Sequence, residues 1–129
     1  MPTEEIYVGA RFTVRGWVEN GTCLVFEFLD ELEANGDSDY KRLNYLINRM
    51  ADNGVILNKK HVRPLDDKIY EFKAPNTARI LFFYDKGSLI ICSHGFSGKS
   101  GNEQKFIQKQ IKKATSIRDD YFKEVGEEK

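Results

Sequence analysis

Residues 69–96 read IYEFKAPNTARILFFYDKGSLIICSHGF, and this stretch decides the fold. It holds three runs rich in β-branched and aromatic residues, and Pro, Asn, Asp and Gly lie between the runs. The runs are residues 69–73, 79–84 and 89–96. The second and third runs are almost unbroken apolar sequence, which is typical of central strands covered on both faces. The stretch therefore predicts an antiparallel meander of three strands.

Upstream of the meander, residues 6–18 alternate between apolar and polar side chains, which predicts one half-buried strand. Asn20-Gly21 then gives a turn signal. After it, Leu24, Phe28 and Leu32 recur at helical spacing among acidic residues, and we expect a first helix there. Residues 23–28 are also rich in β-forming residues, so a hairpin across Asn20-Gly21 is the alternative.

Two further helices are indicated on either side of the meander. In one, Leu43, Leu46, Ile47 and Met50 repeat at helical spacing between possible caps at 37–39 and a stop at Asn53-Gly54. In the other, Ser100 and Glu103 have capping-box spacing. The apolar stripe that follows consists of Phe106, Ile107, Ile111, Ala114, Ile117 and Tyr121. The expected order is β-α-α-β-β-β-α, an α+β fold whose first two helices cover one face of an antiparallel sheet.

Length and composition set limits on the class of protein. With 129 residues, 40% of them apolar, we expect one domain over 1–129. We expect a β-α-α part at 1–54, a meander and helix at 55–123, and a tail at 124–129. The two cysteines are 69 positions apart and favour a reduced, cytoplasmic location over a disulfide scaffold. No apolar run suggests a membrane span, and no ligand spacing suggests a metal or another cofactor.

The formal net charge of zero hides an uneven distribution. Residues 1–53 carry five basic and ten acidic side chains, whereas residues 54–113 carry twelve basic and five acidic ones. The first segment has a net charge of minus five and the second has plus seven. A partner that is a polyanion is therefore compatible with the middle of the chain, although the total charge gives no sign of one.

Cations lie at both ends of the turn that joins the first two strands of the meander. Lys73 precedes this turn and Arg79 follows it, so a hairpin places both on one sheet face. Lys59 and Lys60 come shortly before the meander, and Lys99 follows it. Together they predict a concave phosphate site. Solvated surface lysines are the alternative for each lysine taken singly, whereas Arg79 begins an apolar strand and is more constrained.

Three segments of the meander resemble a known family. Residues 69–73, residues 79–87 and His94-Gly95-Phe96 are similar, in this order, to motifs of the RelE/ParE superfamily of type II toxin-antitoxin toxins. Within it they resemble the HigB-like, phage-related branch, whose pattern residues 65–121 follow. The resemblance implies a RelE-like toxin fold. It also implies a partner, a cognate antitoxin that is commonly a helix-turn-helix protein from an adjacent gene.

The resemblance further implies a cytoplasmic enzyme that cleaves messenger RNA on the ribosome without a metal or other cofactor. Such a ribonuclease makes a 2′,3′-cyclic phosphate, which requires a base, an acid and cations facing the developing charge. Lys73, Arg79 and Lys99 match the family's basic residues and are the expected catalytic residues. Lys59, Lys60, His61 and His94 are second-rank candidates for RNA binding or catalysis, and a structural role is the alternative for His94.

Two other functions remain open at this point. ParE-type members of the superfamily inhibit DNA gyrase without cutting RNA. The fold is also compatible with an inactive module that only binds a protein partner, because Lys73 stands where the family usually has Arg. Lysine keeps the charge of arginine but loses its bidentate fork.

Overall fold

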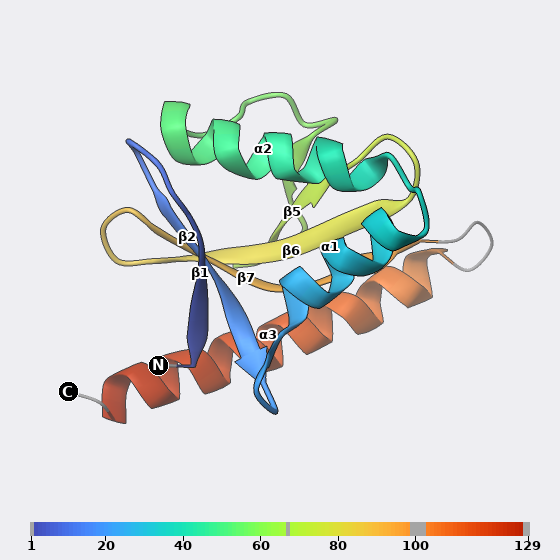
Figure 1. The fold of residues 1–129 in the computed structure, drawn as a ribbon. Helices are drawn as coiled ribbons and strands as arrows, with labels where there is room; N and C mark the ends of the chain where they lie inside the picture. Colours follow the sequence, from blue (N-terminus) through green and yellow to red (C-terminus); the bar gives the residue numbers. More distant parts are fainter. Residues whose placement is uncertain (1, 67, 99–102, 128–129) are drawn as a thin grey trace.

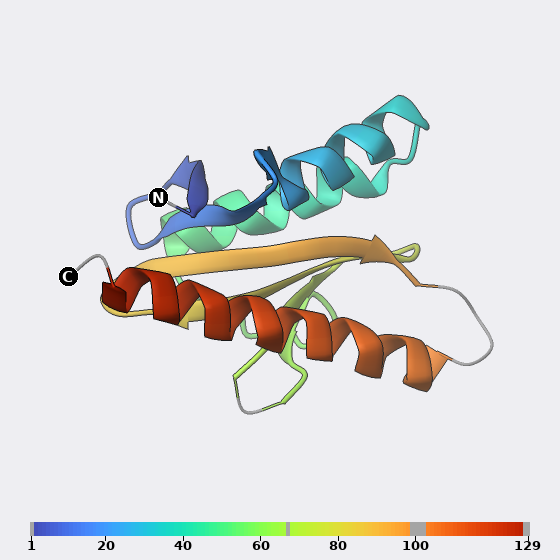
Figure 2. The same ribbon diagram turned by 90° about the horizontal axis from the view of Figure 1, so that it is seen from below.

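The structure is a computed structural model, and it describes residues 2–66, 68–98 and 103–127. A sheet forms the middle layer, helices α1 and α2 cover one of its faces, and helix α3 crosses the other (Figures 1 and 2). Within the described residues, seven strands make up this sheet, in the order β1-β2-β7-β6-β5-β4, with β3 paired to β2. The expected α+β architecture, with the first two helices on one face, is confirmed.

The predicted meander is present as three antiparallel strands. They are β5 (Tyr70–Lys73), β6 (Ala78–Asp85) and β7 (Leu89–Ser97). Strand β6 lies between the other two, and its residues from 78 to 83 are all buried. Alternate side chains contribute to separate cores, because Ile80 and Phe82 face α1 and α2 whereas Leu81 and Phe83 face α3.

The single strand expected over residues 6–18 is wrong. Two antiparallel strands occupy this region, β1 (Thr3–Val8) and β2 (Thr13–Glu19), with a tight turn in which the Gly9 N–H donates to the Phe12 carbonyl. The apolar alternation continues on both sides of the turn, so the pattern alone does not reveal it. The turn packs against the end of α2 and requires glycine, because a Cβ on Gly9 would lie 2.3 Å from the Ala51 backbone.

Strand β2 changes the character of the sheet. It pairs with β7 in parallel, Val14 opposite Ile90 and Gly16 opposite Cys92, so the sheet is mostly but not wholly antiparallel. This parallel pair joins the N-terminal hairpin to the meander.

Both alternatives considered after Asn20-Gly21 are partly present. Asn20 and Gly21 have φ of 51° and 79°, values that suit a tight hairpin turn, and β3 (Thr22–Cys23) pairs back on β2. The helix α1 (Leu24–Ala34) then begins at once. The hairpin is therefore limited to two residues, and the predicted helix is confirmed.

Helix α2 (Asp39–Asn53) matches its prediction, with buried residues at Leu43, Leu46, Ile47 and Met50. It ends at Gly54, whose φ of 99° is unfavourable for a side chain. The buried Asp39 carboxylate accepts hydrogen bonds from the backbone N–H groups of residues 76, 77 and 78. This contact fastens the start of α2 to the turn between β5 and β6.

Helix α3 (Glu103–Glu127) buries Ala114, Ile117 and Tyr121 of the predicted stripe. The Tyr121 hydroxyl donates to Asp85 at 2.5 Å, which holds the C-terminal half of α3 against the end of β6. The expected capping box at Ser100 lies outside the described residues.

A further strand, β4 (Val62–Pro64), was not predicted and forms the edge beside β5. The expected order β-α-α-β-β-β-α is therefore wrong in its strands. The described residues give β-β-β-α-α-β-β-β-β-α.

Candidate functional site

Four charged side chains lie together on the α3 face of the sheet, at its β4 edge. The register sets Arg63 of β4 directly opposite Glu71 of β5, and Lys73 of β5 directly opposite Arg79 of β6. Directly opposed residues of neighbouring strands share a face, so the predicted convergence of Lys73 and Arg79 is present in the structure.

Glu71 lies at the centre of this group and is fully buried. The Arg63 Nε donates to Glu71 Oε1 at 2.7 Å, and Arg79 Nη1 lies 3.8 Å from Glu71 Oε2. The Arg63 side chain is 42% exposed, whereas that of Arg79 is 6% exposed. A buried carboxylate needs a cation close by, because desolvation strongly disfavours an isolated charge. Glu71 therefore holds the Arg63 guanidinium by a hydrogen bond and lies within ion-pair distance of the Arg79 guanidinium.

A pocket of about 530 Å³ opens above these side chains. Its floor and one wall come from Arg63, Leu65, Lys73 and Arg79, and α3 supplies the other wall. The α3 residues are Gln104, Ile107, Gln108 and Ile111. Among the described residues, this lining includes three cations and neither a carboxylate nor an imidazole. The pocket is therefore suited to an anion whose other groups can bond to amides.

The basic surface continues over the outer side of α3. A neighbouring hollow of about 440 Å³ is lined by Lys105, Lys109 and Lys112, and it shares Gln104 and Gln108 with the first pocket. The three lysines follow one another at spacings of four and three residues, which places them on one side of the helix. A polyanion in the pocket can thus extend across the first turns of α3.

The structure separates the three expected catalytic residues. Lys73 is half-buried and lines the pocket, and none of the ion pairs among the described residues involves it. Arg79 also lines the pocket, but it is 5% exposed and beside Glu71. Lys99 lies outside the described residues. Of the two that the structure describes, Lys73 is thus the side chain placed to reach a ligand.

His94 is outside the pocket and 3% exposed. Its Nε2 lies 2.8 Å from the Gln110 amide oxygen of α3, and its Nδ1 lies 3.0 Å from the Ser93 hydroxyl. Burial lowers the pKa of His94 to about 4, and the nearby Lys113 acts in the same direction. These contacts support the structural alternative, a neutral histidine that joins β7 to α3.

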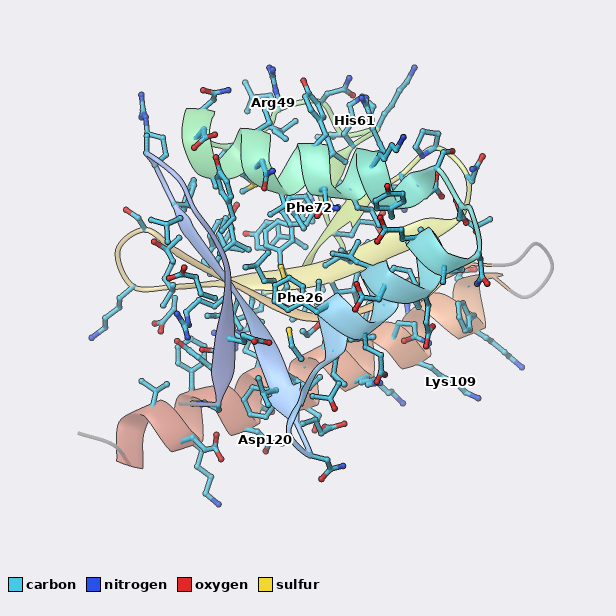
Figure 3. The ribbon with its side chains drawn as sticks, viewed as in Figure 1. Phe26, Arg49, His61, Phe72, Lys109 and Asp120 are labelled. Carbon is cyan, nitrogen blue, oxygen red and sulfur yellow. The ribbon has the colours of Figure 1, made fainter. Side chains whose placement is uncertain are left out.

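Lys59, Lys60 and His61 belong to a turn that precedes β4, and the structure does not bring them to the pocket. His61 Nε2 lies 3.3 Å from Arg42 Nη2 of α2. Figure 3 shows His61 and Arg49 over α2, whereas Lys109 lies beside α3 on the other side of the sheet. These second-rank residues thus form a separate surface.

Sequence reasoning missed two members of the site, Arg63 and Glu71. Arg63 lies in the strand that was not predicted. Glu71 had a usable signal, because it alternates with Tyr70 and Phe72 in a buried strand and such a carboxylate requires a partner.

Comparison with known proteins gives one family. No curated protein matches the chain. None of the described helices has the length and apolar character needed to cross a membrane. Residues 27–119 match the family described as phage-derived protein Gp49-like (DUF891), and this range runs from α1 into α3 and includes the whole pocket. Because the match covers more than half of its length, the chain belongs to the phage-derived Gp49-like family.

Proposed function

We propose that this protein is the toxin of a type II toxin-antitoxin system, of the HigB-like branch of the RelE/ParE superfamily, and that it cleaves messenger RNA on the ribosome. The observation that carries the proposal is the convergence of Arg63, Lys73 and Arg79 on one pocket over a single buried carboxylate. Membership of a phage-derived family supports it, because most of the HigB-like pattern lies inside the matched residues 27–119.

The reaction is a transesterification within the RNA backbone. The ribose 2′-oxygen attacks the adjacent phosphorus, the bond from phosphorus to the 5′-oxygen breaks, and a 2′,3′-cyclic phosphate and a 5′-hydroxyl result. The 2′-hydroxyl loses a proton and the leaving oxygen gains one. Negative charge grows on the non-bridging oxygens during the attack, and cations that are already in place stabilise it.

The residues of the pocket have different roles in this reaction, and their exposure decides which of them can contact the RNA. Lys73 and Arg63 reach the pocket and are the groups that we assign to the scissile phosphate. Arg79 is an electrostatic residue at the pocket floor, beside the Glu71 carboxylate. Gln104 and Gln108 offer amides to the ribose or to a base.

The test is a cleavage assay on messenger RNA with and without ribosomes, followed by primer extension to map the cuts. Lys73→Met is expected to lower the rate at least 100-fold, while Lys73→Arg keeps it, because arginine restores the charge and the family's usual side chain. Lys86→Met is the matched control, since Lys86 is an exposed lysine in the turn between β6 and β7. Equal rates for Lys73→Met and Lys86→Met would contradict the assignment.

A second candidate is a module that binds a protein partner and has no activity. The burial of Arg79 beside Glu71 favours it, as does a pocket lining in which no described side chain is a carboxylate or imidazole base. Expression without a partner separates the two candidates. The toxin arrests growth and leaves cut transcripts, whereas the binding module leaves growth and transcripts intact.

Under the first proposal the partner is an antitoxin, with acidic side chains to place over the pocket. Co-expression with the small protein encoded beside this gene is expected to restore growth. Lys73→Met removes one of the cations that such a partner would contact. It should therefore also weaken the complex, measured by calorimetry.

A further inference from the structure

A second group of cations lies on the outer face of α2, across the sheet from the pocket. Arg42, Tyr45 and Arg49 are spaced three and four residues apart, so they form one stripe along the helix. The Arg42 guanidinium lies 5.3 Å from the centre of the Tyr45 ring, and Arg49 Nη1 donates to the Tyr45 hydroxyl at 3.4 Å. The exposed Tyr45 ring thus contacts two arginine side chains.

The loop after α2 adds further positive charge. Lys59 and Lys60 are exposed there, and His61 Nε2 approaches Arg42 Nη2 at 3.3 Å. Arg42 can only donate, so a hydrogen bond here uses the His61 nitrogen as its acceptor. Arg42 is thus oriented by a side chain that is not an acid, and none of the ion pairs among the described residues involves it.

The two carboxylates of α2 accept hydrogen bonds from groups outside the helix, and neither forms an ion pair with an arginine among the described residues. Asp39 is buried against the turn at residues 76–78, and Asp52 accepts a hydrogen bond from the Tyr7 hydroxyl at 2.7 Å. Across the parts of the chain that the structure describes, the ion pairs involve only Glu71 with Arg63 and Arg79. Cations held close together without an anion raise the energy of the free protein, and an anionic ligand relieves that repulsion.

We propose that this surface, formed by Arg42, Tyr45, Arg49, Lys59 and Lys60, binds the backbone and one base of single-stranded RNA. Phosphates lie against the arginines and lysines, and a base stacks on Tyr45 or on a guanidinium plane. The Tyr45 side chain favours RNA over an acidic protein segment, because 49% of its surface is exposed between two planar cations and an unpaired base stacks well there.

The surface goes beyond the proposed function, because it lies on the opposite side of the sheet from the pocket and binding there requires no cleavage. Figure 3 shows the separation, with Arg49 and His61 over α2 and Lys109 beside α3. An RNA strand that is held at α2 and also enters the pocket would have to pass round the edge of the sheet.

The experiment measures fluorescence anisotropy of a labelled 12-nucleotide single strand of 2′-O-methyl RNA, which cannot be cleaved by its own 2′-oxygen. The double variant Arg42→Gln/Arg49→Gln is expected to bind at least tenfold more weakly than the unaltered protein. Loss of two phosphate contacts also lowers the slope of log affinity against log salt by about 1.4. Tyr45→Ala is expected to lose about tenfold in affinity, and Tyr45→Phe to keep most of it.

The matched control is Arg118→Gln on α3, because Arg118 also lies over an aromatic ring, 4.8 Å from the centre of Phe122. If the double variant binds the RNA as tightly as Arg118→Gln does, the proposal is overturned. If it keeps its RNA affinity but loses affinity for poly-glutamate, the surface recognises an acidic protein segment instead, and the RNA proposal is equally overturned.

Folding and the proposed function are checked separately. Unfolding in urea confirms that each variant is folded, and Arg49→Gln alone replaces the double variant if the latter is not, because Arg49 is exposed. If the unaltered protein binds the RNA, the double variant loses that binding, and the unaltered protein cuts no messenger RNA, the proposed activity is refuted and the α2 surface stands.

Discussion

The two faces of strands β5 and β6 differ sharply, although neighbouring residues of the same strands form them. Toward α1 and α2 the strands present Phe72, Ile80 and Phe82, and these side chains are fully buried. Toward α3, near the β4 edge, they present Glu71, Lys73 and Arg79. Alternation along a strand thus lets the face toward α1 and α2 be wholly apolar, while the face toward α3 combines the buried Leu81 and Phe83 with charged residues near the β4 edge.

The α3 face is itself divided along its length. The C-terminal half of α3 buries Ala114, Ile117 and Tyr121 against the sheet, whereas Phe106 and Ile107 in the first turns are only half-buried. The pocket lies beneath this less buried end. The helix therefore has an anchoring half and a half that forms a wall, and the following predictions test this division and that between the faces.

The largest effect is expected from Glu71→Ala. This substitution leaves the buried Arg79 guanidinium without its carboxylate, at a cost of about 3–5 kcal/mol in the free energy of unfolding. Urea unfolding followed by circular dichroism measures it, with Lys73→Ala as the control near zero.

The double variant Glu71→Leu/Arg79→Met sharpens this test. Two apolar side chains of similar volume need no charge partner, so the double variant is expected to be more stable than Glu71→Ala. A double variant that is as unstable as Glu71→Ala would mean that packing, and not charge, sets the cost.

A smaller effect is expected from pH, through His94. Its pKa is lowered from 6.5 to about 4, so the folded state keeps the ring neutral and binds fewer protons than the unfolded state. The stabilisation is complete above pH 6.5 and is lost as the pH falls toward 4, by about 3 kcal/mol in all.

His94→Gln removes this titration, because glutamine gains no proton in that range. The quantity to compare is the change in unfolding free energy between pH 7 and pH 4.5, measured for both proteins. Equal changes would show that the carboxylates, and not His94, set the acid sensitivity.

The smallest effect is expected in the wall half of α3. Ile107→Ala should cost about 1 kcal/mol because its side chain is only half-buried, whereas Ile117→Ala should cost about 2–5 kcal/mol. Thermal unfolding of the two variants gives the comparison. Similar losses at both positions would mean that the two halves of α3 are anchored alike.

Much of the fold could be predicted from local pattern. The meander, α1 and α2 follow from runs of β-forming residues, helical spacing and stop signals at Gly54 and Gly87. The N-terminal hairpin could not be predicted in this way, because the apolar alternation is the same on both sides of its turn. Strand β4 has three residues, too few for a β pattern to be recognised, and it is defined by its pairing with β5.

The candidate site was predictable in part. The turn between β5 and β6 places Lys73 and Arg79 together, and this follows from the sequence once the hairpin is expected. The burial of Arg79 beside Glu71 depends on β4 and α3 covering that edge. The grouping of Lys59, Lys60 and His61 with α2 depends likewise on the path of a loop, which local pattern does not determine.

The parallel pairing of β2 with β7 has a consequence for how the chain acquires its shape. Val14 pairs with Ile90, so the middle of the sheet forms only when residues about 76 positions apart have come together. Contacts so far apart along the chain make folding slow, because a long loop must close first. During synthesis the N-terminal hairpin cannot join the sheet until β7 has been made. Fragments that end before β7 therefore lack the central part of the sheet. A truncated product of this gene is expected to be unfolded and inactive.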